Sequence, residues 1–144
     1  MKQLFVILFL AVASVSFAQG NRIISVLTAA DTSSASQTHY LYPLGGTSWA
    51  TTGAIDYNAG VEFLIETDSL SGATAGTLTI EVAYDDAGTY SYAVGTLTVN
   101  GATNQQLRLE DTDFLARKIR AKIVNTAGVQ STKIQGVLVV KRKQ

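Results

Sequence analysis

The sequence predicts an all-β protein: an antiparallel β-sandwich, immunoglobulin-like or jelly-roll in connectivity, of about eight short strands that follow an N-terminal hydrophobic leader. Three observations predict it. Apolar and polar residues alternate with a period of two through most of residues 19–144, as expected for strands with one buried face. Clusters of Gly, Ser, Asn and Asp separate the alternating segments and are typical of turns. Only Glu110–Ala121 offers a place for a helix, and its strict alternation after Arg117 favours a strand.

The first predicted strands are Arg22–Ala29, Gln37–Leu44 and Gly60–Thr67. Asp31–Ser36 is a polar segment and is expected to connect the first two. Pro43 has no backbone N–H to donate, so the second strand is expected to lie at a sheet edge or to end near this residue.

The next two predicted strands, Thr77–Tyr84 and Thr89–Val99, form a hairpin about the turn Asp85–Gly88. A loop of small residues, Asp68–Gly76, precedes them. The alternation places four side chains inward from the first of these strands: Leu78, Ile80, Val82 and Tyr84. Gly95 interrupts the second strand and predicts a bulge or a bend.

The last third of the chain is expected to contain a short strand, Gln105–Leu109, after a turn at Asn100-Gly101. Glu110–Asp113 then leads into Phe114–Lys143, which holds two long alternating runs. We expect these runs to form a hairpin around the turn Asn125–Gly128. The first run has an apolar face and a cationic face, and the cationic face carries Lys118, Arg120 and Lys122.

Charge is unevenly distributed along the chain. Every acidic residue lies at or before Asp113, whereas eight Lys or Arg and no carboxylate follow Phe114, although the formal net charge is zero. One interpretation is cross-strand pairing of the cationic face with Glu62 and Glu66 or with Glu81. The other is head-to-tail association between copies, in which a basic face meets an acidic face and builds rings or filaments. The second interpretation makes Lys118, Arg120 and Lys122 candidate interface residues.

Aromatic residues give a second set of candidate interface residues: Trp49, Tyr90 and Tyr92. An exposed row of rings could stack on sugars or form an oligomer interface. The alternative is a core role, with Tyr84 and Tyr90 packed across their hairpin.

No catalytic, cofactor-binding or metal-binding residue is predicted, and we expect the protein not to be an enzyme. His39 is the only histidine, and no Gly-x-Ser-x-Gly motif accompanies it. The pairs Asp85/Asp86 and Asp111/Asp113 are expected to form turns through bonds to their own backbone, because neither pair has the spacing of a calcium loop. The absence of cysteine excludes disulfides. The balanced charge argues against nucleic acid as a partner.

Residues 1–18 have the order of a secretory signal peptide. Lys2 precedes the apolar run Leu4–Val12, and small residues end the segment before Gln19. An uncleaved segment of this kind would be the only membrane contact, although its apolar part is short for a bilayer span. The expected organisation is therefore a leader, 1–18, and a single domain, 19–144, that is exported or belongs to a virion.

The order of strands and turns resembles small β-sandwich structural proteins of tailed and related phages. Four segments carry the resemblance: Gly76–Tyr90, Asn100-Gly101, Phe114–Lys122 and Gly136–Arg142. The leader is similar to those of exported proteins from Bacteroidetes-type bacteria. The resemblance implies a non-enzymatic structural or assembly subunit, in a virion or a surface filament, that contacts copies of itself. The alternative is an exported binding module for a glycan or another surface ligand, using the Trp49 loop and the tyrosines.

Overall fold

The computed structural model describes residues 22–34, 36–55, 59–71, 74–101, 104–126 and 131–141, and it is all-β over those residues. The predicted leader and the terminal residues 142–144 lie outside the described residues. No helix in the described ranges is long and apolar enough to cross a membrane. The described ranges contain eight strands: β1 Arg22–Ser34, β2 Thr38–Leu41, β3 Ala59–Ser71, β4 Thr74–Ala83, β5 Ser91–Gly101, β6 Gln105–Phe114, β7 Lys118–Asn125 and β8 Ser131–Lys141.

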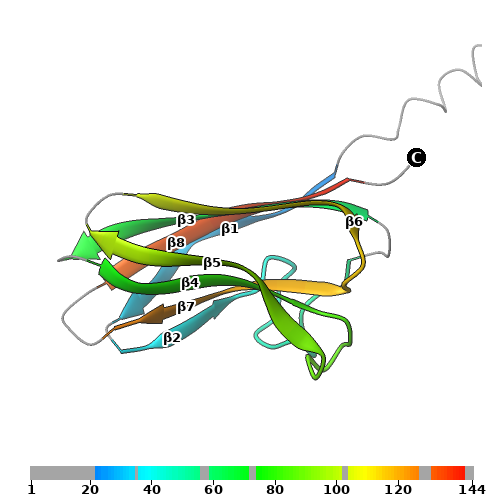
Figure 1. The fold of residues 1–144 in the computed structure, drawn as a ribbon, viewed down its shortest axis with the longest axis horizontal. Helices are drawn as coiled ribbons and strands as arrows, with labels where there is room; N and C mark the ends of the chain where they lie inside the picture. Colours follow the sequence, from blue (N-terminus) through cyan, green and yellow to red (C-terminus); the bar gives the residue numbers. More distant parts are fainter. Residues whose placement is uncertain are drawn as a thin grey trace, which may run out of the picture.

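The strands form two four-stranded sheets that pack face to face (Figure 1). One sheet has the order β1-β8-β3-β6 and the other has the order β2-β7-β4-β5. Every pair is antiparallel, and the first four strands pair in turn with the last four, β1 with β8, β2 with β7, β3 with β6 and β4 with β5. This is the nested order of a double-sheet jelly roll. The jelly-roll alternative is therefore confirmed, and the immunoglobulin-like one is wrong.

The core lies between the sheets and follows the predicted alternation. Inward rows from β3 and β8 of one sheet face inward rows from β4 and β7 of the other. The fully buried members include Val61, Phe63, Ile65, Leu78, Ile80, Val82, Ile119, Ala121, Ile123, Ile134 and Leu138. Burial of these side chains is the main stabilising term of such a sandwich, at roughly 1.5–3 kcal/mol for each large apolar side chain.

The predicted hairpin across Phe114–Lys143 is wrong. β7 pairs with β2 and β4, whereas β8 pairs with β1 and β3 in the opposite sheet. The segment therefore crosses from one sheet to the other. The alternation of apolar and polar residues could not reveal this crossover. Every second side chain of a strand is buried whether the next strand along the chain lies beside it or in the opposite sheet.

Several predicted loops belong to strands. Asp31–Ser36 contains the end of β1, and Asp68–Gly76 contains the end of β3 and the start of β4. Asn100-Gly101 closes β5, and Glu110–Asp113 lies within β6. These small and polar residues pair with a neighbouring strand, so pairing prevails over their weak strand propensity.

Three local predictions are confirmed. The turn Asp85–Gly88 connects β4 to β5. Glu81 pairs with Ala93 and Ile80 pairs with Gly95, which leaves Val94 as the extra residue of a bulge. β2 ends before Pro43 and is one of the two edge strands of its sheet.

Candidate functional site

The cationic residue Arg120 lies in the middle of an internal network on the outer face of the β7–β4 pair. Its Nε and Nη2 lie 2.8 Å and 2.6 Å from Glu81 Oε2, and its Nη1 donates to the Tyr42 hydroxyl at 2.9 Å. The guanidinium carbon is 4.1 Å from the ring centroid of Tyr40 and 4.2 Å from that of Trp49. The guanidinium is thus paired with a carboxylate and stacked by aromatic rings within one chain.

Lys118 is buried, with 3% of its side chain exposed. Its Nζ donates to the backbone carbonyl of Trp49 and to that of Asp86 at 3.4 Å. The ammonium therefore ties the β2–β3 loop and the β4–β5 turn to β7, and it is not available to a partner.

Lys122 completes the predicted cationic face, with Nζ 3.5 Å from Glu81 Oε1. Cross-strand pairing of this face is therefore confirmed for Glu81. Glu62 and Glu66 have other partners: Glu62 pairs with Arg108 at 2.7 Å, and Glu66 accepts a hydrogen bond from Gln135 at 2.8 Å.

Trp49 is 7% exposed and lies beneath the β4–β5 turn. A Cβ built on Gly88, whose φ is +77°, would fall 1.9 Å from Trp49 Cδ1. Tyr42 packs edge-on against the indole, with ring centroids 5.9 Å apart. The structure thus brings Trp49 together with Lys118 and Arg120. The indole is buried and supports two loops, so it does not offer a surface on which a sugar could stack.

The tyrosines of the β4–β5 hairpin are exposed: Tyr90 is 71% exposed, Tyr92 49% and Tyr84 42%. The expected burial of Tyr84 and its packing with Tyr90 are wrong. Tyr84 instead contacts Tyr92, with ring centroids 5.7 Å apart and hydroxyls 2.7 Å apart. That hydrogen bond raises the pKa of the Tyr92 phenol. These rings continue the inward row of β4 and β5, but they lie at an open end of the sandwich.

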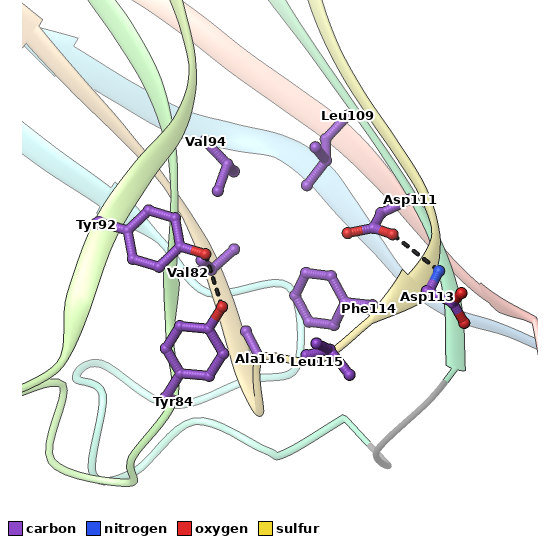
Figure 2. Close-up of a pocket in the computed structure, with 10 residues that line it drawn as sticks. All are labelled: Val82, Tyr84, Tyr92, Val94, Leu109, Asp111, Asp113, Phe114, Leu115 and Ala116. Carbon is purple, nitrogen blue, oxygen red and sulfur yellow. Dashed lines mark hydrogen bonds between the residues drawn. The ribbon is translucent and has the colours of Figure 1, made fainter.

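A pocket of about 170 Å³ lies at this open end, between β5 of one sheet and β6 of the other (Figure 2). Tyr84 and Tyr92 stand on one side of it, and Asp111 stands on the other with Phe114 between them. The remaining lining residues are Val82, Val94, Leu109, Asp113, Leu115 and Ala116. No lining residue is cationic.

The predicted hydrogen bonds from aspartate side chains to nearby backbone are confirmed for Asp85 and Asp111, although Asp111 lies in strand β6 and not in a turn. Asp111 Oδ1 accepts a hydrogen bond from the backbone N–H of Asp113 at 2.8 Å. Asp85 accepts hydrogen bonds from the backbone N–H groups of Thr89 and Tyr90, at 3.1 Å and 2.9 Å. No group of three or more His, Cys, Asp or Glu side chains that could hold a metal occurs in the described ranges. His39 is half-buried on β2, where it pairs with Ile123.

β5 is paired with another strand on one side only, β4, in the part of the chain that the structure describes. None of its eleven residues is charged, and most of their side chains are exposed. The other three edge strands differ. β6 carries four charged residues, β1 contains Arg22 and Asp31, and β2 has only four residues. Natural edge strands are commonly short or charged because an uncharged edge pairs readily with another strand.

No family model matches the chain, and no curated protein matches it. Solved structures do resemble it. The xylan-binding CBM22-1 domain of Paenibacillus barcinonensis Xyn10C matches with a TM-score of 0.50 and 12% identity, over 88% of this chain and 99% of that domain. This likeness shows a shared β-sandwich fold.

Two further structures match with lower TM-scores. A subunit of the disulfide-linked pili of Bacillus endospore appendages has a TM-score of 0.47 and 16% identity, over 88% of this chain and 95% of that one. A chain of the T13 particle of the infectious bursal disease virus has a TM-score of 0.49 and 15% identity, over 85% of this chain and 31% of that one.

Sequence reasoning missed the pocket and the open edge. Strand order decides which strands are edges, and one sequence does not give strand order. A usable signal was present for β5, since Ser91–Gly101 is a long alternating run without a single charge.

Proposed function

We propose that this protein is a non-enzymatic structural subunit that associates with copies of itself through the edge of β5, in an extracellular or virion assembly. One observation carries the proposal: β5 is a long, uncharged edge strand at which backbone N–H and C=O groups face outward. Addition of a strand to such an edge supplies main-chain hydrogen bonds and is a common way for β-proteins to associate.

The contact is expected beyond the bulge, over Gly95–Asn100. Thr96 and Thr98 point outward there and face Thr79 and Thr77 on β4. Two β5 strands laid antiparallel meet with threonine, leucine, valine and asparagine side chains, none of which is charged, so no charge is desolvated at the contact. Such a two-fold contact would join two four-stranded sheets into one continuous sheet.

The cationic face does not support the proposal in the form that the sequence suggested. Lys118, Arg120 and Lys122 contact groups of their own chain. Tyr90 and Tyr92 remain candidate contact residues because they are exposed beside the start of β5. The leader pattern of residues 1–18 supports export.

The test compares sedimentation of the full chain over a concentration series for wild type, Thr98→Lys and Thr112→Lys. Thr98→Lys places a charge at the proposed contact, whereas the matched control places the same charge on the outer face of β6, where Thr112 is exposed. We expect Thr98→Lys to weaken association at least about tenfold, or about 1.4 kcal/mol, and Thr112→Lys to leave it unchanged. A wild type that stays monomeric at every concentration would refute the proposal.

The glycan-binding alternative is weakened at Trp49, because this indole is buried beneath Gly88 and is not exposed to a sugar. The exposed tyrosines remain available to a sugar, and the experiment described below includes a sugar as a probe.

A further inference from the structure

We infer that the pocket between β5 and β6 binds the side chain of a lysine or arginine from a neighbouring copy of this chain. The inference rests on the proposed self-association for the source of that side chain. The chemistry of the pocket stands on separate observations.

The first observation is the aromatic wall. Tyr84 and Tyr92 lie with an angle of 30° between their ring planes, and both remain substantially exposed although they continue an inward-facing row. A cation within about 6 Å of a tyrosine ring face is attracted by the ring quadrupole. The apolar lining residues, Leu109 and Phe114 among them, suit the methylene stem of a long basic side chain.

The second observation is the carboxylate opposite the rings. Asp111 pairs with Val61, which is 1% exposed and faces the core, so the Asp111 side chain is directed toward the inside of the sandwich. Figure 2 shows this carboxylate facing the tyrosine hydroxyls across the pocket. An ammonium or guanidinium there would donate charge-assisted hydrogen bonds to the Asp111 carboxylate.

Asp111 also has an explanation that needs no ligand. An inward charge on an edge strand discourages pairing of that edge, and β6 is an edge strand. This accounts for the carboxylate alone. It does not account for two half-exposed tyrosines placed opposite the carboxylate over an apolar floor.

The size of the pocket favours one side chain over a larger ligand. Its volume is about 170 Å³, whereas sites for drug-sized molecules usually measure about 300–1,000 Å³. Eight Lys or Arg residues and no carboxylate follow Phe114. Three of them, Lys118, Arg120 and Lys122, contact groups of their own chain, so a neighbouring copy would supply the side chain from the other five. The pocket belongs to the acidic part of the chain and its occupant to the basic part, so the two are complementary in charge.

The pocket chemistry is tested by NMR titration of the full chain with N-acetyl-arginine amide. N-acetyl-citrulline amide is the matched neutral probe, and xylose is the sugar probe. We expect saturable shifts of the Tyr92 and Asp111 signals with the arginine probe only. Asp111→Asn should weaken binding at least about tenfold, and it keeps an oxygen that can accept the Asp113 N–H bond. Equal binding of arginine and citrulline, binding of xylose alone, or no binding of any probe would overturn the inference.

The source of the occupant is tested by sedimentation at low and high salt. We expect Asp111→Asn to reduce association at low salt and to lose most of the salt dependence of the wild type.

If Thr98→Lys has no effect while Asp111→Asn does, the β5 edge proposal fails and the pocket inference stands. If the arginine probe binds but Asp111→Asn associates like the wild type, the occupant is not another copy and the inference is overturned. If the wild type never associates, self-association fails and the occupant from a copy fails with it.

Discussion

Arg120 on β7 and Glu81 on β4 are directly paired across adjacent strands, and two guanidinium nitrogens contact one carboxylate oxygen at 2.8 Å and 2.6 Å. Both side chains are largely buried, with 14% and 15% exposed. This pair explains why the most cationic strand of the protein does not present a basic surface.

Glu81→Gln is expected to lower the free energy of unfolding by about 1–3 kcal/mol, because it leaves a largely buried guanidinium without its counter-charge. Urea denaturation measures the change. Glu110→Gln is the control, since Glu110 pairs with Arg108 at 3.1 Å where both side chains are more than half exposed, and its cost should stay below about 1 kcal/mol. Equal costs for the two variants would contradict this account of the pair.

Lys118→Met is expected to loosen the Trp49 loop. Methionine keeps the aliphatic stem but removes the ammonium that donates to the Trp49 carbonyl, at a cost of about 1–3 kcal/mol for the acceptor left without its donor. Tryptophan fluorescence should shift to the red as the single indole gains contact with water. An unchanged emission spectrum and unchanged stability would show that the loop does not depend on Lys118.

Gly88→Ala is expected to destabilise the protein more than Gly45→Ala does. Both glycines have left-handed φ angles, +77° and +80°, so both substitutions strain the backbone, by roughly 1–2 kcal/mol. Only Gly88 also lies against Trp49, whereas a Cβ on Gly45 would meet nothing within 4 Å. Thermal denaturation and near-UV circular dichroism of the two variants separate the two causes. Equal losses would mean that the indole moves away at no cost.

Acidification is expected to disorder the β4–β5 turn before the core unfolds. Hydrogen bonds from the Tyr90 and Thr89 N–H groups hold the pKa of Asp85 below its usual value. A carboxyl with a depressed folded-state pKa stabilises the fold above its unfolded pKa, about 3.9, and that contribution is lost as the pH falls through the folded pKa.

Amide signals of Thr89 and Tyr90 followed by NMR between neutral pH and pH values below the usual aspartate pKa measure this loss. In Asp85→Asn the pH dependence of these signals should disappear. Persistence of the same transition in that variant would assign it to another group.

The alternation of side chains was enough to predict the fold class. The Asp85–Gly88 turn and the irregularity at Gly95 were predicted from turn-forming residues and from a glycine within a strand. Alternation was not enough to predict the crossover between β7 and β8, because a strand buries one face whether its successor lies in the same sheet or in the opposite one. The cationic residues were correctly placed on one strand face. Their use was not predictable, since pairing with Glu81 depends on which strand lies next to β7.

The exposure of Tyr84 and Tyr92 escaped prediction for a related reason. Both continue inward-facing rows, which predicts burial. The sandwich is open where these rows end, beside Asp111 of the opposite sheet. Whether a side chain at the end of a row is covered depends on how far the opposite sheet extends, and that is a property of the tertiary structure.

Backbone amide exchange over Gly95–Asn100, compared between associated and dilute full-length protein, tests the central claim most directly. About half of the amides in an edge strand point away from the neighbouring strand. In this stretch the Asn100 N–H already donates to Gln105 Oε1 at 3.0 Å, and the other outward amides exchange with water. The β5 edge contact predicts that these amides become protected on association, while the amides of the other edge strands do not change. Association that leaves the exchange of Gly95–Asn100 unchanged would contradict the claim.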